Sequence, residues 1–123
     1  MIYNENGYKV KFYQDDKGDI PMISYLEKIN KKEKAKILKY IEFLKDNEGY
    51  LDEPYSKHIN GKIRELRVDV SKNKHRIFYF TFIKKTIILL HAFLKITAKT
   101  PNKEINKAED NLKSVIKYPK LYE

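Results

Sequence analysis

The three arginines of this sequence are the residues whose type and position point most directly to chemistry. Arg64, Arg67 and Arg76 lie in one short central stretch, whereas lysines occur throughout the chain. In a lysine-rich chain, an arginine is expected where a planar, two-pronged donor for a phosphate or carboxylate is needed. The stretch therefore predicts an anion-binding site. Surface ion pairs from the arginines to Glu65 or Asp69 are the alternative.

The overall charge favours an anionic partner. The 123 residues include 26 lysines and arginines against 17 acidic residues, a formal net charge of +9. Polyanions bind such chains because their phosphates release condensed counterions. A lysine-rich composition that only solvates the surface would give the same charge, so it stays an alternative.

Few residues are suited to acid–base or metal chemistry. The sequence has no cysteine, which excludes disulfides, thiolate metal sites and a cysteine nucleophile. Of the three histidines, His58, His75 and His91, the last lies inside an apolar segment. It is either a core histidine satisfied by a hydrogen bond or a catalytic group. No His, Asp and Glu have metal-ligand spacing, so we expect no metal and no cofactor.

Hydrophobic periodicity predicts the elements that must position these groups. The predicted strands are 8–14, 62–70, 76–83 and 86–93, and the predicted helices run from Pro21 to about Ile29, from Lys31 to about Asn47, and from Thr100 to about Lys117. Residues 50–61 are irregular and contain Pro54, so a loop is predicted there. Short connections at 71–74 and 84–85 predict hairpins, and therefore an antiparallel sheet.

The strand at 62–70 alternates, so its two faces can be assigned. Arg64 lies on the apolar face, which we expect to pack against the helices, and Arg67 lies on the other, partly open face with Glu65 and Asp69. Arg76 begins the next strand at the rim of the sheet. The order of elements predicts an α+β fold, with an N-terminal strand and a helical hairpin packed on an antiparallel sheet, followed by a C-terminal helix.

The length predicts a single domain over residues 1–123. Polar residues at 3–6 interrupt the N-terminal segment, so no signal peptide is predicted. The longest apolar runs are far shorter than the roughly 20 residues of a membrane span. We therefore expect a cytoplasmic protein with no membrane partner.

Four segments, taken in order, resemble a known family. They are Lys57–Val68 (KHINGKIRELRV), His75–Phe80 (HRIFYF), Leu89–Lys95 (LLHAFLK) and Lys99–Pro101 (KTP). The series resembles the HigB-type branch of the RelE-like toxins, which includes phage-derived members. Gly18, Pro21 and Ala108 also fall where this branch has them. The resemblance covers nearly the whole chain, and the ordered set is more specific than any single motif.

The resemblance implies a RelE-like fold and the toxin of a type II toxin–antitoxin system, acting as a ribosome-dependent messenger-RNA endonuclease. Its partners would be messenger RNA on the ribosome and a cognate antitoxin, often of the helix-turn-helix type, in a hetero-oligomer. Arg67, Arg76 and Lys95 match the positively charged site of the family. Lys62 and Arg64 match its additional basic positions.

One residue departs from the pattern of the branch. Ile96 stands where a second lysine is usual. Activity could be weaker for this reason, or Lys99 could supply the missing charge. The basic surface would also suit an acidic segment of the antitoxin through charge complementarity.

Cleavage of RNA needs little from a protein, because the 2′-hydroxyl of the RNA is itself the nucleophile. The protein supplies a base, positive charge for the phosphorane and an acid for the leaving oxygen. We expect Arg67 and Arg76 to hold the phosphate, and Lys95 to neutralise charge or protonate the leaving oxygen. The base is open between a histidine, His91 among them, and a lysine whose pKa is lowered by basic neighbours. Tyr79 could stack on a nucleobase or pack in the core.

Two other functions fit the same residues. The fold could bind RNA or the ribosome without cutting, or it could poison gyrase as the related ParE-like branch does. New RNA 5′ ends would distinguish a nuclease from a binding module, and DNA damage would indicate a gyrase poison.

Overall fold

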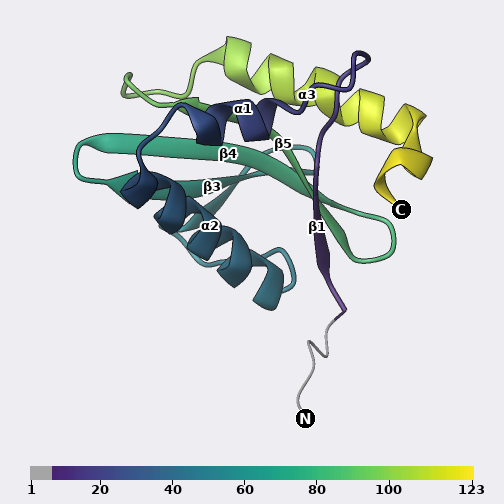
Figure 1. Cartoon of the computed structure of the whole chain (residues 1–123), viewed down its shortest axis with the longest axis horizontal. Coiled ribbons are helices and arrows are strands. Elements are labelled where there is room, and N and C mark those ends of the chain that lie inside the picture. Colours follow the sequence, from purple (N-terminus) through teal and green to yellow (C-terminus); the bar gives the residue numbers. More distant parts are fainter. Residues whose placement is uncertain (1–6) are drawn as a thin grey trace.

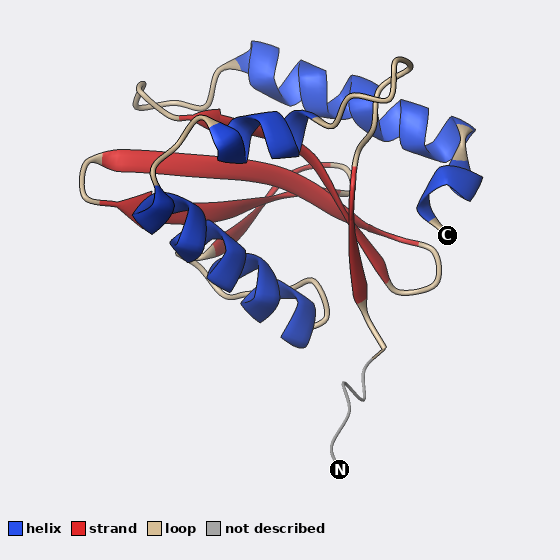
Figure 2. Cartoon of the chain, in the orientation of Figure 1, coloured by secondary structure: helices blue, strands red, loops and turns tan. Residues whose placement is uncertain are grey.

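The structure, a computed structural model, describes residues 7–123 as one sheet with helices on both sides (Figures 1 and 2). Its elements are β1 (Lys9–Phe12), α1 (Pro21–Glu27), α2 (Lys31–Asp46), β2 (Ser56–Asn60), β3 (Ile63–Val70), β4 (Asn73–Phe82), β5 (Thr86–Leu94), α3 (Asn102–Lys117) and a 3₁₀ helix, η1 (Pro119–Tyr122). The predicted α+β class is confirmed. The first six residues of the predicted domain 1–123 lie outside the described part, and within that part no helix is long and apolar enough to cross a membrane.

The five strands form one mixed sheet in the order β1-β5-β4-β3-β2. β3, β4 and β5 are antiparallel neighbours, as predicted, whereas β1 runs parallel to β5 at the edge. The prediction of a purely antiparallel sheet is therefore wrong at this edge. Hairpin lengths determine only how consecutive strands pair, and the long connection between β1 and β5 allows a parallel pairing.

The predicted loop at 50–61 contains a strand, so that prediction is wrong for β2. This strand pairs with β3, with Ser56 opposite Leu66. Ser56 is the one buried residue of β2, and the other side chains of this strand are half-buried or exposed. A short edge strand of this kind carries no apolar alternation, so the hydrophobic pattern did not mark it.

Helices cover both faces of the sheet, each over its own core. Met22 of α1 and Ile37 of α2 pack with Leu66 on one face. Val115 of α3 packs with Phe78 on the other, and Figure 1 shows α3 on the opposite side of the sheet from α2. Our expectation that the helices gather on one face is wrong for α3, because the apolar runs of β4 and β5 need cover on both faces.

α2 is positioned by its cap and its apolar stripe. The Oδ1 of Asn30 accepts a backbone N–H of the first turn at 2.8 Å, which satisfies a donor that the helix itself leaves unpaired. Ile37, Ile41 and Leu44 form the buried apolar stripe of the helix, whereas Leu38 is 43% exposed. The residues of the stripe are spaced four and three apart, and Leu38 lies to one side of it.

Candidate functional site

Arg67 of β3 and Arg76 of β4 lie directly opposite each other in the sheet. Opposite residues of an antiparallel pair point to the same face. That face is the one that α3 partly covers, because Ile63 and Phe78, which alternate in step with the arginines, belong to the core beneath α3. The predicted projection of both guanidinium groups from neighbouring strands is confirmed.

Both arginines line a cavity of about 330 Å³ at the edge of the sheet, which we name the cationic cavity. Its lining contains four cations, one carboxylate, two tyrosines and a proline: Lys36, Tyr40, Pro54, Tyr55, Arg67, Asp69, Lys74 and Arg76. α2 provides the residues at 36 and 40, and the segment before β2 provides those at 54 and 55. Sequence reasoning did not identify these four residues, because only the packing of α2 against the sheet brings them to the arginines.

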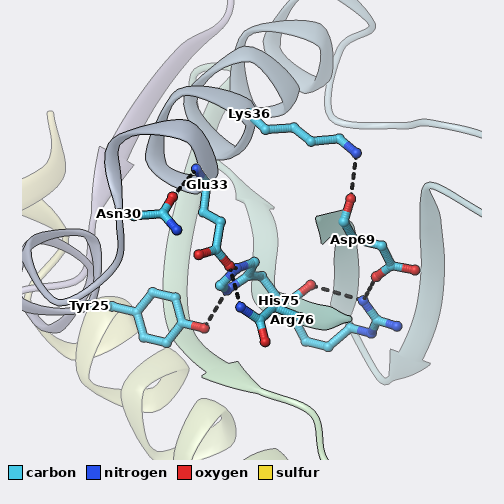
Figure 3. Close-up of polar contacts among 8 residues, drawn as sticks. Tyr25, Asn30, Glu33, Lys36, Asp69, His75 and Arg76 are labelled. Atoms are coloured by element: carbon cyan, nitrogen blue, oxygen red, sulfur yellow. Dashed lines mark hydrogen bonds and ion pairs between the residues drawn. The ribbon is translucent and has the colours of Figure 1, made fainter. Parts of the chain in front are cut away.

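Arg76 is buried at the back of this cavity and is held by Asp69 (Figure 3). Its side chain is 3% exposed. Its Nη1 donates to Asp69 Oδ1 at 2.6 Å and to the carbonyl oxygen of His75 at 3.0 Å, while its Nε has no hydrogen-bond partner. Lys36 donates to the backbone carbonyl of Asp69. Because the Asp69 carboxylate occupies Nη1 and its side chain is 57% exposed, an anion that binds Nη1 of Arg76 would compete with this carboxylate, and an anion on any other nitrogen of Arg76 would lie close to its negative charge.

Glu65 is a buried carboxylate among cations, and sequence reasoning considered it only as a surface partner. It is 2% exposed, and its Oε1 lies 3.4 Å from Arg67 Nε. Neither Glu65 Oε2 nor Arg67 Nε has a hydrogen-bond partner. Burial raises the pKa of the Glu65 carboxyl above its usual range, although Arg67, Arg76, Lys95 and Lys57 all oppose the shift. The Glu65 side chain therefore faces Arg67, and its single charge could not neutralise all four of these cations.

Lys95 joins the same group of charges from the segment after β5. Its backbone N–H donates to the carbonyl oxygen of Lys74 at 2.8 Å. Burial lowers the pKa of its ammonium group, and the charge of Arg76 lowers it further. A lysine with a lowered pKa transfers a proton more readily at neutral pH. Ile96, the residue that departs from the family pattern, is 87% exposed beside it.

Tyr79 and Arg64 are placed elsewhere and have structural partners. Tyr79 is fully buried on the face of the sheet that α1 and α2 cover. Its hydroxyl donates to the carbonyl oxygen of Gly49 at 3.0 Å and contacts Ser56 Oγ at 2.7 Å. Of the alternatives for Tyr79, packing in the core is the one observed, and its enclosed ring cannot stack on a nucleobase. Arg64 lies 4.6 Å from the centre of the Tyr50 ring and donates to Ser56 Oγ at 3.1 Å.

Three further predicted residues do not line the cationic cavity. His91 shares the face of the arginines, but its Nε2 is 2.8 Å from Glu104 Oε1 and its ring stacks with that of Phe93. Lys62 lines a separate cavity beside α3. Lys99 is exposed in the segment before α3. Their predicted roles in catalysis and RNA binding therefore have no support from position.

His75 belongs to a buried network on the opposite face, which Figure 3 shows. Its Nδ1 is 2.7 Å from the Tyr25 hydroxyl and its Nε2 is 2.7 Å from Glu33 Oε1. Hydrogen bonds from Asn73 and from His75 lower the pKa of Glu33, so the ionised carboxylate accepts both. The network attaches α1 and α2 to the start of β4 and thereby fixes the backbone from which Arg76 projects.

The cationic cavity is suited to a phosphodiester. Two guanidinium groups offer paired donors to phosphate oxygens, and lysines provide further charge at its rim. No histidine lines it, and His58 binds the carbonyl oxygen of Gly61 in the exposed β2–β3 turn. Among residues 7–123, no three His, Cys, Asp or Glu residues gather as a metal site would require.

Comparison with known proteins places the chain in a family. The model of the family described as "Phage derived protein Gp49-like (DUF891)" matches residues 24–113. No curated protein matches the sequence. The matched segment covers well over half of the chain and includes every residue that lines the cationic cavity. The chain therefore belongs to the Gp49-like family of phage-derived, toxin-like proteins.

Proposed function

We propose that this protein is the toxin of a type II toxin–antitoxin system, of the RelE-like kind and HigB type, and that it cuts messenger RNA on the ribosome without a metal ion. The observation that carries the proposal is the pair Arg67 and Arg76, opposite each other on neighbouring strands and lining one cationic cavity. Membership of a toxin-like family supports the toxin part of the proposal.

The residues in and near the cavity would have different roles in a transesterification. Arg67, whose side chain is 26% exposed, meets the scissile phosphate first, and the more deeply buried Arg76 stabilises the charge that develops on the phosphorane. Lys95 does not line the cavity, but it interacts electrostatically with Arg67 and Arg76, and its pKa is lowered. It transfers one proton, either to the 5′-leaving oxygen or from the attacking 2′-hydroxyl, and a water molecule transfers the other. Loss of one such charge costs on the order of 10²- to 10³-fold in rate.

The same charges suit the antitoxin partner. An acidic segment that enters the cationic cavity would occupy the arginines and exclude RNA. Such binding would weaken as salt concentration rises, because screening acts on exposed charges. The proposed complex is a cytoplasmic hetero-oligomer of toxin and antitoxin.

The test is cleavage of a defined messenger RNA in a purified translation system. Expected products have new 5′ ends at ribosome-occupied codons and 2′,3′-cyclic phosphates, the mark of attack by the 2′-hydroxyl. Arg67→Ala and Arg76→Ala should each reduce the cutting rate by about 10²- to 10³-fold. Lys113→Ala, a matched control on the exposed side of α3, removes the same charge and should cut normally.

Other results would assign a different function. Arrest of translation without new RNA ends would make the protein a binding module. DNA breaks without RNA cleavage would make it a gyrase poison. Full cutting by a folded double variant that lacks both arginines would refute the site.

A further inference from the structure

A second pocket adjoins the cationic cavity and is lined mainly by aromatic rings. This pocket, which we name the aromatic pocket, has a volume of about 310 Å³, and its lining is Tyr40, Phe43, Asn47, Leu51 and Tyr55. Tyr40 and Tyr55 also line the cationic cavity. The two hollows therefore share a wall, with rings on one side and guanidinium groups on the other.

Two of the three rings of the aromatic pocket are exposed, whereas Tyr40 is half-buried and packs against the core. Phe43 is 42% exposed and Tyr55 is 50% exposed. The Tyr40 ring centre lies 5.8 Å from that of Phe43 and 6.0 Å from that of Tyr55. Exposed aromatic side chains that gather in this way are typical of a binding surface.

The charges around these rings indicate the kind of ligand. The Nζ of Lys36 lies 5.6 Å from the centre of the Tyr40 ring, and the Nζ of Lys39 lies 5.7 Å from that of Phe43. The aromatic rings are bordered by cations and lie beside the cationic cavity. Proteins hold single-stranded nucleic acid by this combination of aromatic rings for the bases and positive charge for the backbone. A purely apolar segment of a protein partner would bury the rings equally well, but it would gain nothing from the lysines beside them. An acidic antitoxin segment would gain from them, and the experiment below distinguishes it from RNA.

We propose that the aromatic pocket binds a nucleobase of single-stranded RNA, next to the phosphate held by Arg67 and Arg76. Phe43 and Tyr55 stack on the base. Asn47 also lines the pocket, and because its Nδ2 donates to the carbonyl oxygen of Phe43 at 2.8 Å, its Oδ1 is the atom that would accept from the base edge. This inference rests on the proposed function, since it extends the same RNA from the cationic cavity into the adjoining pocket. It assigns RNA contact to α2 and to the segment before β2, where the sequence offered no motif.

The experiment compares two non-cleavable probes. One is a hexamer of abasic 2′-O-methyl ribose phosphates, and the other is the same hexamer with one central 2-aminopurine. The wild type should bind the second probe about 5- to 100-fold more tightly, the range expected for one base–aromatic stack. Binding should also quench the 2-aminopurine fluorescence.

Phe43→Leu and Tyr55→Leu keep apolar bulk but remove the ring. Each should reduce the gain from the base and the quench. The affinity for the abasic probe should stay unchanged in Phe43→Leu, because Phe43 lines only the aromatic pocket, whereas Tyr55 also lines the cationic cavity. Tyr118→Leu is the matched control, because Tyr118 is 48% exposed with Lys117 5.5 Å from its ring centre, yet it lines neither hollow. Thermal unfolding of each variant verifies that it is folded.

The outcomes separate this inference from the proposed function. If the base adds no affinity, or if the leucine variants keep the full gain, the base subsite is wrong while RNA cleavage can still stand. If Arg67→Ala leaves the abasic affinity unchanged, the phosphate site itself is wrong. If the leucine variants bind both probes normally but lose a co-expressed antitoxin, the aromatic pocket is a protein-docking site, and the nucleobase assignment is overturned.

Discussion

Replacement of Asp69 by asparagine is expected to open the cationic cavity to anions. Asp69 Oδ1 occupies Nη1 of Arg76 at 2.6 Å, and its side chain is 57% exposed. At such exposure the effective dielectric constant is close to that of water, so a carboxylate and a phosphate about 4 Å apart repel by about 1 kcal/mol. Removal of the carboxylate charge should therefore raise the affinity for sulfate, a phosphate mimic, by about fivefold.

The same substitution should lower the stability of the anion-free protein. Asparagine still offers an oxygen to Arg76, so the loss is that of a half-exposed ion pair, at most about 1 kcal/mol. For a chain of this size that corresponds to a fall in Tm of about 4 °C. Added sulfate should raise the Tm of Asp69→Asn more than that of the wild type, because ligand binding at concentration c stabilises by RT ln(1 + c/Kd), which is larger at a given sulfate concentration for the tighter binder.

Calorimetric titration with sulfate and Tm measurements at constant ionic strength test both parts. Asp110→Asn is the matched control, because Asp110 is an exposed aspartate on α3 and the substitution changes net charge equally. Equal sulfate affinity in Asp69→Asn and the wild type would refute competition for Arg76. An equal gain in Asp110→Asn would attribute the effect to net charge alone.

Two further predictions concern buried groups. Burial raises the pKa of Glu65, so the folded state favours the protonated form of this carboxyl. The wild type should therefore lose stability relative to Glu65→Gln as pH rises from below 4.5 through the raised pKa. Urea unfolding across that range measures the difference, and the opposite slope would contradict the prediction. Gly49→Ala should destabilise by about 1–3 kcal/mol, because Gly49 has φ +84° and an added Cβ would lie 2.6 Å from Thr81 Oγ1. Gly61→Ala, at φ +53° with open space around it, should lose less, and an equal loss in thermal unfolding would show that the clash is absent.

The placement of the two arginines on neighbouring strands was accessible to sequence reasoning because it depends on local patterns. Alternation along β3 separates Arg67 from the apolar face, and a short connection predicts a hairpin with the strand of Arg76. The direct pairing was not predicted, because it depends on a turn at 71–72 that is two residues shorter than the predicted connection at 71–74. The same reasoning correctly located α2 and α3, whose apolar residues repeat at helical spacing.

The remainder of the site depends on tertiary packing that no local pattern records. Lys36 and Tyr40 read as part of an ordinary solvated helix face until α2 is packed beside the sheet. Glu65 reads as a surface partner of Arg67, yet β2 and the neighbouring cations enclose it. The apolar run of β4 indicates burial on both faces, which favours core packing for Tyr79, but it does not reveal the buried hydrogen bonds of its hydroxyl to Gly49 and Ser56.

The group of charges around Arg67 is poorly explained by folding alone. One buried carboxylate, Glu65, faces several cations and keeps a raised pKa among them, and Lys95 has a lowered pKa because of burial and repulsion. Buried donors on Arg67 and Arg76 have no hydrogen-bond partner. A fold selected only for stability would replace such residues, since unpaired buried groups destabilise it. A phosphate on the exposed part of Arg67 would relieve the repulsion among the cations, so this group of charges supports the anion site that we propose.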